Sequence, residues 1–132
     1  MEEKKDRLKY KKLLDFMCLL KTDREMSKYL FIKTKNIKNL YEYRYNNDLL
    51  LCMNSFIDKT TCFKRLREVY IGANYSEGNW CKAIDNLNID RKKYYNTLKA
   101  EYEQIKAQTY EVEDVLYNKY ILNRKEDSHA LI

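Results

Sequence analysis

Residues that break regular secondary structure are almost absent from this chain. Its 132 residues include no proline and two glycines, Gly72 and Gly78. Proline and glycine stop helices and permit the tight turns of small β-sheets, so a chain with so few of them favours long helices. The length suits a single domain with a modest core. We therefore expect a small all-α domain that spans 1–132.

Apolar residues recur at intervals of three and four along the first part of the chain, which is the pattern of amphipathic helices. The pattern predicts several N-terminal helices within 1–57. We expect one break near Thr22 or Asp23, either of which is a good N-cap residue. We expect a second break at 46–47, after which Asp48 would cap a very apolar helix.

The segment 60–107 is predicted to hold a helix-turn-helix. A helix over 62–71 would end at Gly72, because glycine commonly terminates helices, and a loop would follow. A separate C-terminal helix is expected over 108–124. The last residues, 125–132, are expected to form a frayed tail.

The stretch NWCKAIDNLNIDRKKYYNTLK, at 79–99, contains two short helical patterns joined by a turn. The side chains expected to hold them together are Trp80, Ala83, Ile84, Leu87, Ile89, Tyr94, Leu98 and Tyr102. Ile89 would plug the corner between the helices, and Asp90 would cap the second helix. The candidate DNA contacts on that second helix are Arg91, Lys92, Lys93, Tyr95, Asn96 and Lys99.

These residue types suit a recognition helix, which places its N-terminal residues in the major groove. Arginine binds guanine with two hydrogen bonds, and asparagine binds adenine in the same way. Lysine and tyrosine suit phosphate contacts, and the helix N-terminus favours negative charge. The competing interpretation is an ordinary helical hairpin with a lysine-rich outer face.

The charge of the chain is compatible with a polyanionic partner. The net charge is +6, with a calculated pI of about 9.0. The positive charge lies before residue 108, because 1–50 carries +5, 51–107 carries +3 and 108–132 carries −2. A solvated lysine-rich surface would produce the same balance.

The segment WCKAIDNLNIDRKKYYNTLKAEYEQI resembles the helix-turn-helix in region four of bacterial sigma factors. It is most similar to small phage late-gene regulators of the ArpU and RinA type. The positions that carry the resemblance are Ala83, Ile84, Leu87, Ile89, Asp90, Arg91, Tyr94 and Tyr95. Asn88 replaces the glycine common in that turn, and an extended basic tail is missing. The resemblance implies a sequence-specific transcriptional regulator of phage or mobile-element origin that binds double-stranded DNA.

A helical protein-binding module is the alternative. It would be a phage factor that binds and modulates a host protein, with RNA polymerase as one candidate. Tyr41, Tyr43 and Tyr45 would suit such an interface, because aromatic residues are enriched there; they would equally suit the edge of a core. The N-terminal helices could brace the DNA-binding part, form a homodimer or contact polymerase.

Catalysis, a metal and a cofactor are not expected. The single histidine, His129, lies near the end of the chain, and the sequence has no glycine-rich phosphate loop or nucleophile motif. Cys18, Cys52, Cys62 and Cys81 form no C-x-x-C pair, so we expect buried, reduced thiols rather than zinc ligands. No apolar run approaches the roughly 20 residues that span a bilayer, so we expect a cytoplasmic protein without a membrane partner.

Overall fold

The computed structural model describes residues 2–72 and 90–122, and nearly all of those residues lie in helices. The helices are α1 (Glu2–Thr34), α2 (Ile37–Asp58), α3 (Cys62–Gly72) and α5 (Arg91–Tyr117), and α5 continues as the π-helical η1 (Asn118–Leu122). The described part of the chain contains no strand. The predicted all-α class is confirmed.

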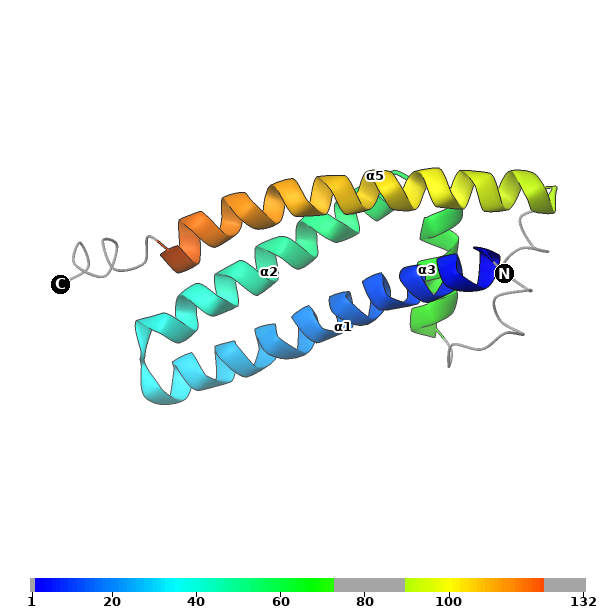
Figure 1. Cartoon of the computed structure of the whole chain (residues 1–132). Helices are drawn as coiled ribbons and strands as arrows, with labels where there is room; N and C mark the ends of the chain where they lie inside the picture. Colours follow the sequence, from blue (N-terminus) through cyan, green and yellow to red (C-terminus); the bar gives the residue numbers. More distant parts are fainter. Residues whose placement is uncertain (1, 73–89, 123–132) are drawn as a thin grey trace.

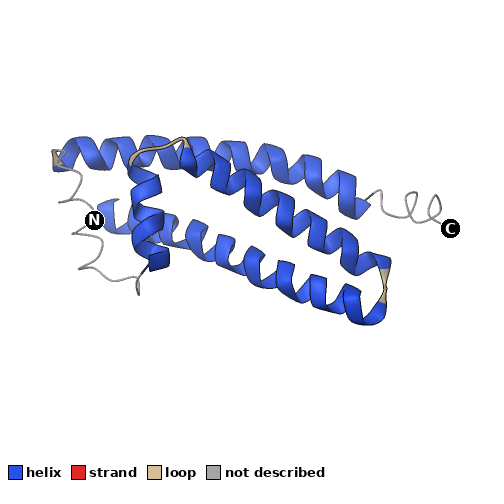
Figure 2. Cartoon of the chain, turned by 180° about the vertical axis from the view of Figure 1, so that it is seen from behind, coloured by secondary structure: helices blue, strands red, loops and turns tan. Residues whose placement is uncertain are grey.

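The three long helices lie side by side, and α3 crosses them near one end (Figure 1). α2 packs against both α1 and α5, whereas α1 and α5 make few contacts with each other. Seen from behind, the same three helices run along the length of the molecule (Figure 2). The start of α5, the start of α1 and α3 therefore share one end of the bundle, while the α1–α2 turn lies at the other.

The predicted breaks in the N-terminal helices are wrong. Thr22 and Asp23 lie inside α1, where the Thr22 hydroxyl donates to the carbonyl of Cys18 at 3.1 Å. Asn46 and Asn47 lie inside α2, and the Asn47 side chain accepts a hydrogen bond from Arg24 of α1 at 3.3 Å. Contacts between helices therefore outweigh the weak local preference of asparagine for turns. The described break between α1 and α2 falls at residues 35–36.

The turn between α1 and α2 uses a left-handed lysine. Lys35 has φ 59°, and its N–H donates to the carbonyl of Phe31 at 2.8 Å, which closes the last turn of α1. Asn36 then caps α2, because its side-chain oxygen accepts from the N–H of Lys38 at 3.0 Å. Glycine is the usual residue at such a helix end, because a Cβ atom disfavours the left-handed conformation.

We expect Lys35→Gly to stabilise the fold by about 0.5–1 kcal/mol. The relief of left-handed strain should exceed the entropy that glycine adds to the unfolded chain. Urea unfolding followed by circular dichroism measures the change. Lys33→Gly, inside the last turn of α1, is the control and should lower stability; a loss at both positions would contradict the role assigned to the Lys35 backbone.

The core is continuous through all the long helices and α3. Its fully buried side chains include Leu14, Leu49, Met53, Ile57, Phe63, Leu66, Tyr94, Leu98 and Ile105. Three rings from three helices meet within it: Tyr10 lies 5.8 Å from Phe63 and 5.0 Å from Tyr102, and the Phe63 and Tyr102 rings are 6.3 Å apart. This aromatic cluster joins α1, α3 and α5, which are distant in the sequence.

The start of α3 is capped by a side chain from α5. The carboxylate of Glu101 accepts from the backbone N–H groups of Thr61, Cys62 and Phe63 at 2.9, 3.0 and 2.9 Å. The first N–H groups of a helix have no partner within the helix, and a carboxylate there also interacts favourably with the helix dipole. Farther along α3, the Tyr70 hydroxyl donates to the carboxylate of Asp15 on α1.

We expect Glu101→Ala to lower the free energy of unfolding by roughly 2 kcal/mol, because three N–H donors at a partly buried helix end would lose a charged acceptor. Urea unfolding of the variant measures the loss. Glu103→Ala, an exposed glutamate on the same helix, is the matched control and should change stability little. Equal losses for the two variants would contradict the capping role of Glu101.

The C-terminal helix predicted over 108–124 is not separate. α5 runs without a break through residues 106–109, where the hydroxyl of the buried Thr109 donates to the carbonyl of Ile105 at 2.7 Å. Beyond α5, the Tyr120 hydroxyl in η1 donates to Asp48 of α2 at 2.8 Å. Among the helices described, none has the length and apolar character needed to cross a membrane.

Candidate nucleic-acid interface

α5 begins at the residue that the sequence predicts. Asp90 is the N-cap residue, and its carboxylate accepts from the N–H of Lys93 at 3.4 Å. The carbonyl of Asp90 accepts from the N–H of Tyr94 at 2.8 Å, which is the first bond of the helical series. Asp90 therefore sets the residue at which the basic segment becomes helical.

One side of this first part of α5 is buried as predicted. Tyr94 and Leu98 have 0% of their surface exposed, and Tyr102 is buried one turn farther on. The Tyr94 ring contacts the Tyr95 ring edge to face at 5.9 Å between centroids. Burial raises the pKa of both the Tyr94 and Tyr102 hydroxyls. The core contact fixes the rotation of α5 about its own axis, and hence the residues that face solvent.

The predicted DNA contacts divide into three groups. Lys92, Lys93, Asn96 and Lys99 are exposed. Tyr95 is half-buried and packs against the core, so part of its surface is taken up by that packing. Arg91 begins the helix, but its side chain lies outside what the structure describes. The structure thus brings four of the six predicted residues onto the accessible side of one helix end.

Charge is strongly separated along α5. Residues 91–99 contain four basic and no acidic residues, whereas 100–117 contain five acidic residues and one basic residue. Lys92, Lys99 and Lys106 recur every seven residues and therefore follow one stripe of the helix, at a spacing of about 10 Å. The stripe offers a row of ammonium groups near the positive end of the helix dipole, which favours anions.

Sequence reasoning missed the neighbours that α1 brings to this stripe. Lys9 and Lys12 line a cavity of about 300 Å³ between α1 and α5 together with Lys106 and Tyr102. The three lysines come from segments more than 90 residues apart in the sequence. The charged pattern MEEKKDRLKYKK at the chain start signals a basic helix, but it does not say which helix it faces.

The first half of the predicted helix-turn-helix lies outside the described residues. Trp80, Ala83, Ile84, Leu87 and Ile89 all fall within 73–89. The second helix was expected to end near residue 106 but continues to Tyr117 as part of the bundle. Its first three turns provide the exposed basic face, and the remainder supplies core residues.

The cysteine prediction is correct in part. Cys62 is buried and Cys52 is half-buried, and burial raises the pKa of both thiols. Cys18 is exposed on α1, so the prediction that it is buried is wrong; Cys81 lies outside the described residues. Across 2–72 and 90–122, no group of three or more histidine, cysteine, aspartate or glutamate side chains is placed to hold a metal ion.

Comparison of the chain with protein-family models, with curated proteins and with solved structures found no match.

Tyr94 has an unusual environment for a tyrosine. Its hydroxyl is buried, and no described residue forms a hydrogen bond with it. A buried hydroxyl without a partner costs free energy that a phenyl ring does not. We therefore expect Tyr94→Phe to raise the free energy of unfolding by about 1 kcal/mol.

Urea unfolding tests the Tyr94→Phe variant against Tyr120→Phe. The Tyr120 hydroxyl donates to Asp48 at 2.8 Å, so its removal should lower stability by about 1 kcal/mol. The same chemical change should thus have opposite signs at the two positions. A loss at both would show that the Tyr94 hydroxyl has a partner.

Proposed function

We propose that the protein binds double-stranded DNA through the first three turns of α5 and regulates transcription. The observation that carries the proposal is the exposed basic face of α5, where an N-capped helix end presents side chains suited to phosphates and base edges. The contacts we propose are Arg91, Lys92, Lys93, Tyr95, Asn96 and Lys99. Asn96 is the candidate for base recognition, and the lysines are the candidates for phosphate contacts.

The rigid attachment of this helix end supports the proposal. A recognition helix must hold its side chains in a fixed register against the groove, because base-edge hydrogen bonds depend on geometry. Leu98 is fully buried, and Glu101 fastens the next turn to α3. The positive charge before residue 108 would add a salt-sensitive attraction to DNA. Such a regulator would act in the cytoplasm, and the sigma-like pattern of 80–105 favours a phage or mobile-element origin.

A protein-binding module is the second candidate, with RNA polymerase or another host protein as its partner. The tyrosines first considered for that role give it little support: Tyr41 is buried, and Tyr45 packs against Tyr117 at 6.4 Å between centroids. The observation that favours protein binding is a different surface, where the exposed Tyr110 and the half-buried Leu13 and Phe16 line a cavity between α1 and α5. The two functions are compatible, because a transcription activator contacts both DNA and polymerase.

Selection from pooled random duplex DNA, followed by titration with salt, tests DNA binding. We expect Lys92→Ala/Lys99→Ala to weaken binding and to reduce the slope of log K against log salt by about 2, because two phosphates would no longer be neutralised by lysine. Asn96→Ala should relax the preference at one base pair, at a cost of about 1–3 kcal/mol for the preferred site.

The matched control is Lys28→Ala/Lys33→Ala, which removes two exposed lysines near the far end of α1. It changes the net charge by the same amount but should leave the selected sequence unchanged and the salt slope nearly so. DNA binding through α5 is refuted if the wild-type protein selects no sequence, or if the two double variants lose affinity equally. The protein-binding candidate would then take its place.

A further inference from the structure

One face of α1 lines two cavities that lie at different positions along the helix. The two cavities are lined by α1 residues that repeat with the three- to four-residue period of a helix: Lys9, Lys12, Leu13, Phe16, Asp23, Met26, Ser27 and Leu30. Leu19, which is 55% exposed, lies between Phe16 and Asp23 at the same helical period, whereas Leu20 beside it is buried in the core. Such spacing places all of these positions on one face of the helix. We call this face, with the α5 and α2 residues opposite it, the groove.

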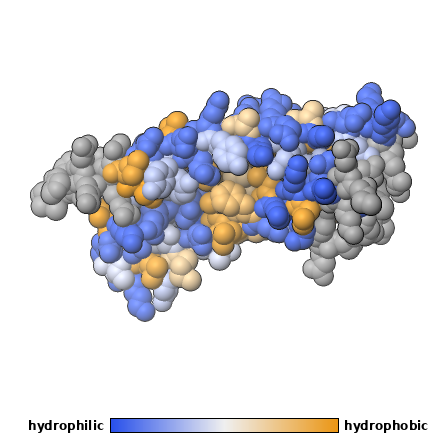
Figure 3. All heavy atoms as spheres, in the orientation of Figure 1, coloured by the Kyte–Doolittle hydropathy of each residue, from blue (hydrophilic) through white to orange (hydrophobic). Residues whose placement is uncertain are grey.

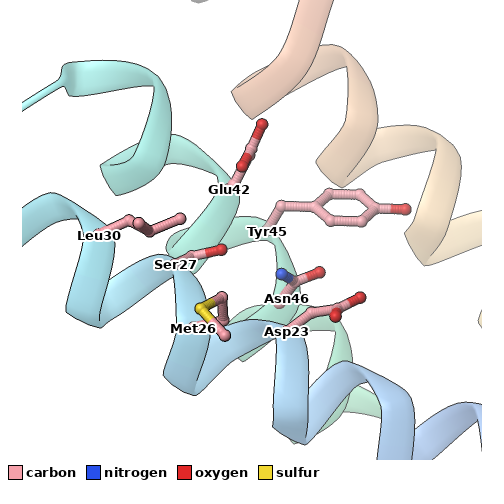
Figure 4. Close-up of a pocket in the computed structure, with 7 residues that line it drawn as sticks. All are labelled: Asp23, Met26, Ser27, Leu30, Glu42, Tyr45 and Asn46. Carbon is pink, nitrogen blue, oxygen red and sulfur yellow. The ribbon is translucent and has the colours of Figure 1, made fainter.

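A different helix faces α1 at each end of the groove. In the cavity of about 300 Å³, the wall is α5, with Tyr102, Lys106 and Tyr110 among its residues. In the cavity of about 340 Å³, the wall is α2, with Glu42, Tyr45 and Asn46 (Figure 4). Tyr45, in the α2 wall of the second cavity, points its ring toward α5 and contacts Tyr117.

The centre of the groove is apolar. Phe16 is half-buried there, and Leu19 is 55% exposed. Met26 on α1 and Tyr110 on α5 are also more than half exposed on its edges. Figure 3 shows apolar side chains gathered between α1 and α5 in the middle of this side of the molecule. A concentration of exposed apolar residues along a groove is typical of an interaction surface.

The two ends of the groove carry opposite charge. Lys9, Lys12 and Lys106 surround the first cavity, with Glu113 as the one acidic residue of its lining. Asp23 and Glu42 line the second cavity, which has no basic residue in its lining. Lys9 is 3.9 Å from Asp6, and Glu42 is 4.0 Å from Lys38. Both contacts are long, and the lysine of each pair is exposed, so these ion pairs are weak.

We propose that the groove is the interface of an antiparallel homodimer, in which a second copy of this chain covers it. A surface that is basic at one end, apolar in the middle and acidic at the other end is complementary to itself after a two-fold rotation. The rotation axis would pass near Phe16 and Leu19, midway between the lysine end and the acidic end. Lys9 and Lys12 of each copy would then face Asp23 and Glu42 of the other.

The opposite charges at the two ends of the groove favour a second copy of this chain over an unrelated partner helix. An acidic amphipathic helix would fit the lysine end but would be repelled by Asp23 and Glu42. A basic helix would have the opposite conflict. A parallel arrangement of two copies would place like charges together at both ends, which is unfavourable. An antiparallel second copy places opposite charges together at both ends of the groove. This pairing does not depend on whether α5 binds DNA.

Sedimentation equilibrium of the full chain, without DNA, tests the proposal. We expect a species of twice the 16.1 kDa chain mass to dominate at roughly 100 µM, as a dimer with a Kd of about 10 µM would. Leu19→Glu should raise that Kd roughly 30-fold or more, because it places a charge at the centre of the interface. Leu51→Glu, at a leucine that is 57% exposed on α2, is the matched control and should leave the Kd unchanged.

Charge reversal tests the antiparallel arrangement. Lys9→Glu/Lys12→Glu and Asp23→Lys/Glu42→Lys should each weaken the dimer about tenfold, because each brings like charges together. The variant that combines all four substitutions should dimerise like the wild type, because both ends are then reversed. Circular dichroism confirms that each variant is folded.

Three results would overturn the proposal. They are a wild-type chain that stays monomeric throughout the concentration range, equal weakening by Leu19→Glu and Leu51→Glu, and a fourfold variant that fails to restore the dimer. DNA selection is measured separately with the same variants. Loss of the dimer with retained DNA selection, or the reverse, therefore separates this inference from the proposed function.

Discussion

The placement of α5, and with it the candidate interface, depends on the contact between α3 and α5. The two helices are far apart in the sequence, yet the Glu101 carboxylate accepts hydrogen bonds from three backbone N–H groups at the start of α3. The rings of Phe63 and Tyr102 stack beside this cap, and Tyr10 closes the cluster from α1. The charged cap satisfies donors that would otherwise be buried or left to water, while the rings exclude solvent around them. Together they fix the position of α5 along the bundle and its rotation about its axis.

The candidate interface is a consequence of that rotation. With Tyr94, Leu98 and Tyr102 in the core, Lys92, Asn96 and Lys99 must face solvent, because residues on opposite sides of a helix cannot both be buried against one surface. The absence of acidic side chains from 91–99 keeps this face positive. Farther along α5 the same stripe meets α1 and becomes a wall of the groove. One helix thus contributes to two surfaces of different chemistry, a basic end and an apolar middle.

The groove follows from unequal packing among the long helices. α2 contacts both of its neighbours extensively, whereas α1 and α5 do not close over it on the other side. Apolar side chains on these two helices consequently remain accessible, and a fold of this size gains stability when such surface is covered. The opposite charges at the two ends give that surface a direction, which a merely apolar groove would lack.

The sequence by itself determined the helical class, the Asp90 cap and the division of α5 into a buried and a charged face. These depend on local spacing, on the scarcity of proline and glycine and on a single capping residue, all of which are properties of neighbouring residues. Tertiary structure decided where α1 ends and α2 begins. The Asn47 side chain accepts a hydrogen bond from Arg24 across the helix pair, and Lys35 adopts a left-handed backbone conformation at the turn. It also decided that Glu101 caps α3, and it placed Lys9 and Lys12 at the same cavity as Lys106. Such pairings join residues far apart in the chain, and local periodicity carries no information about which helix will meet which.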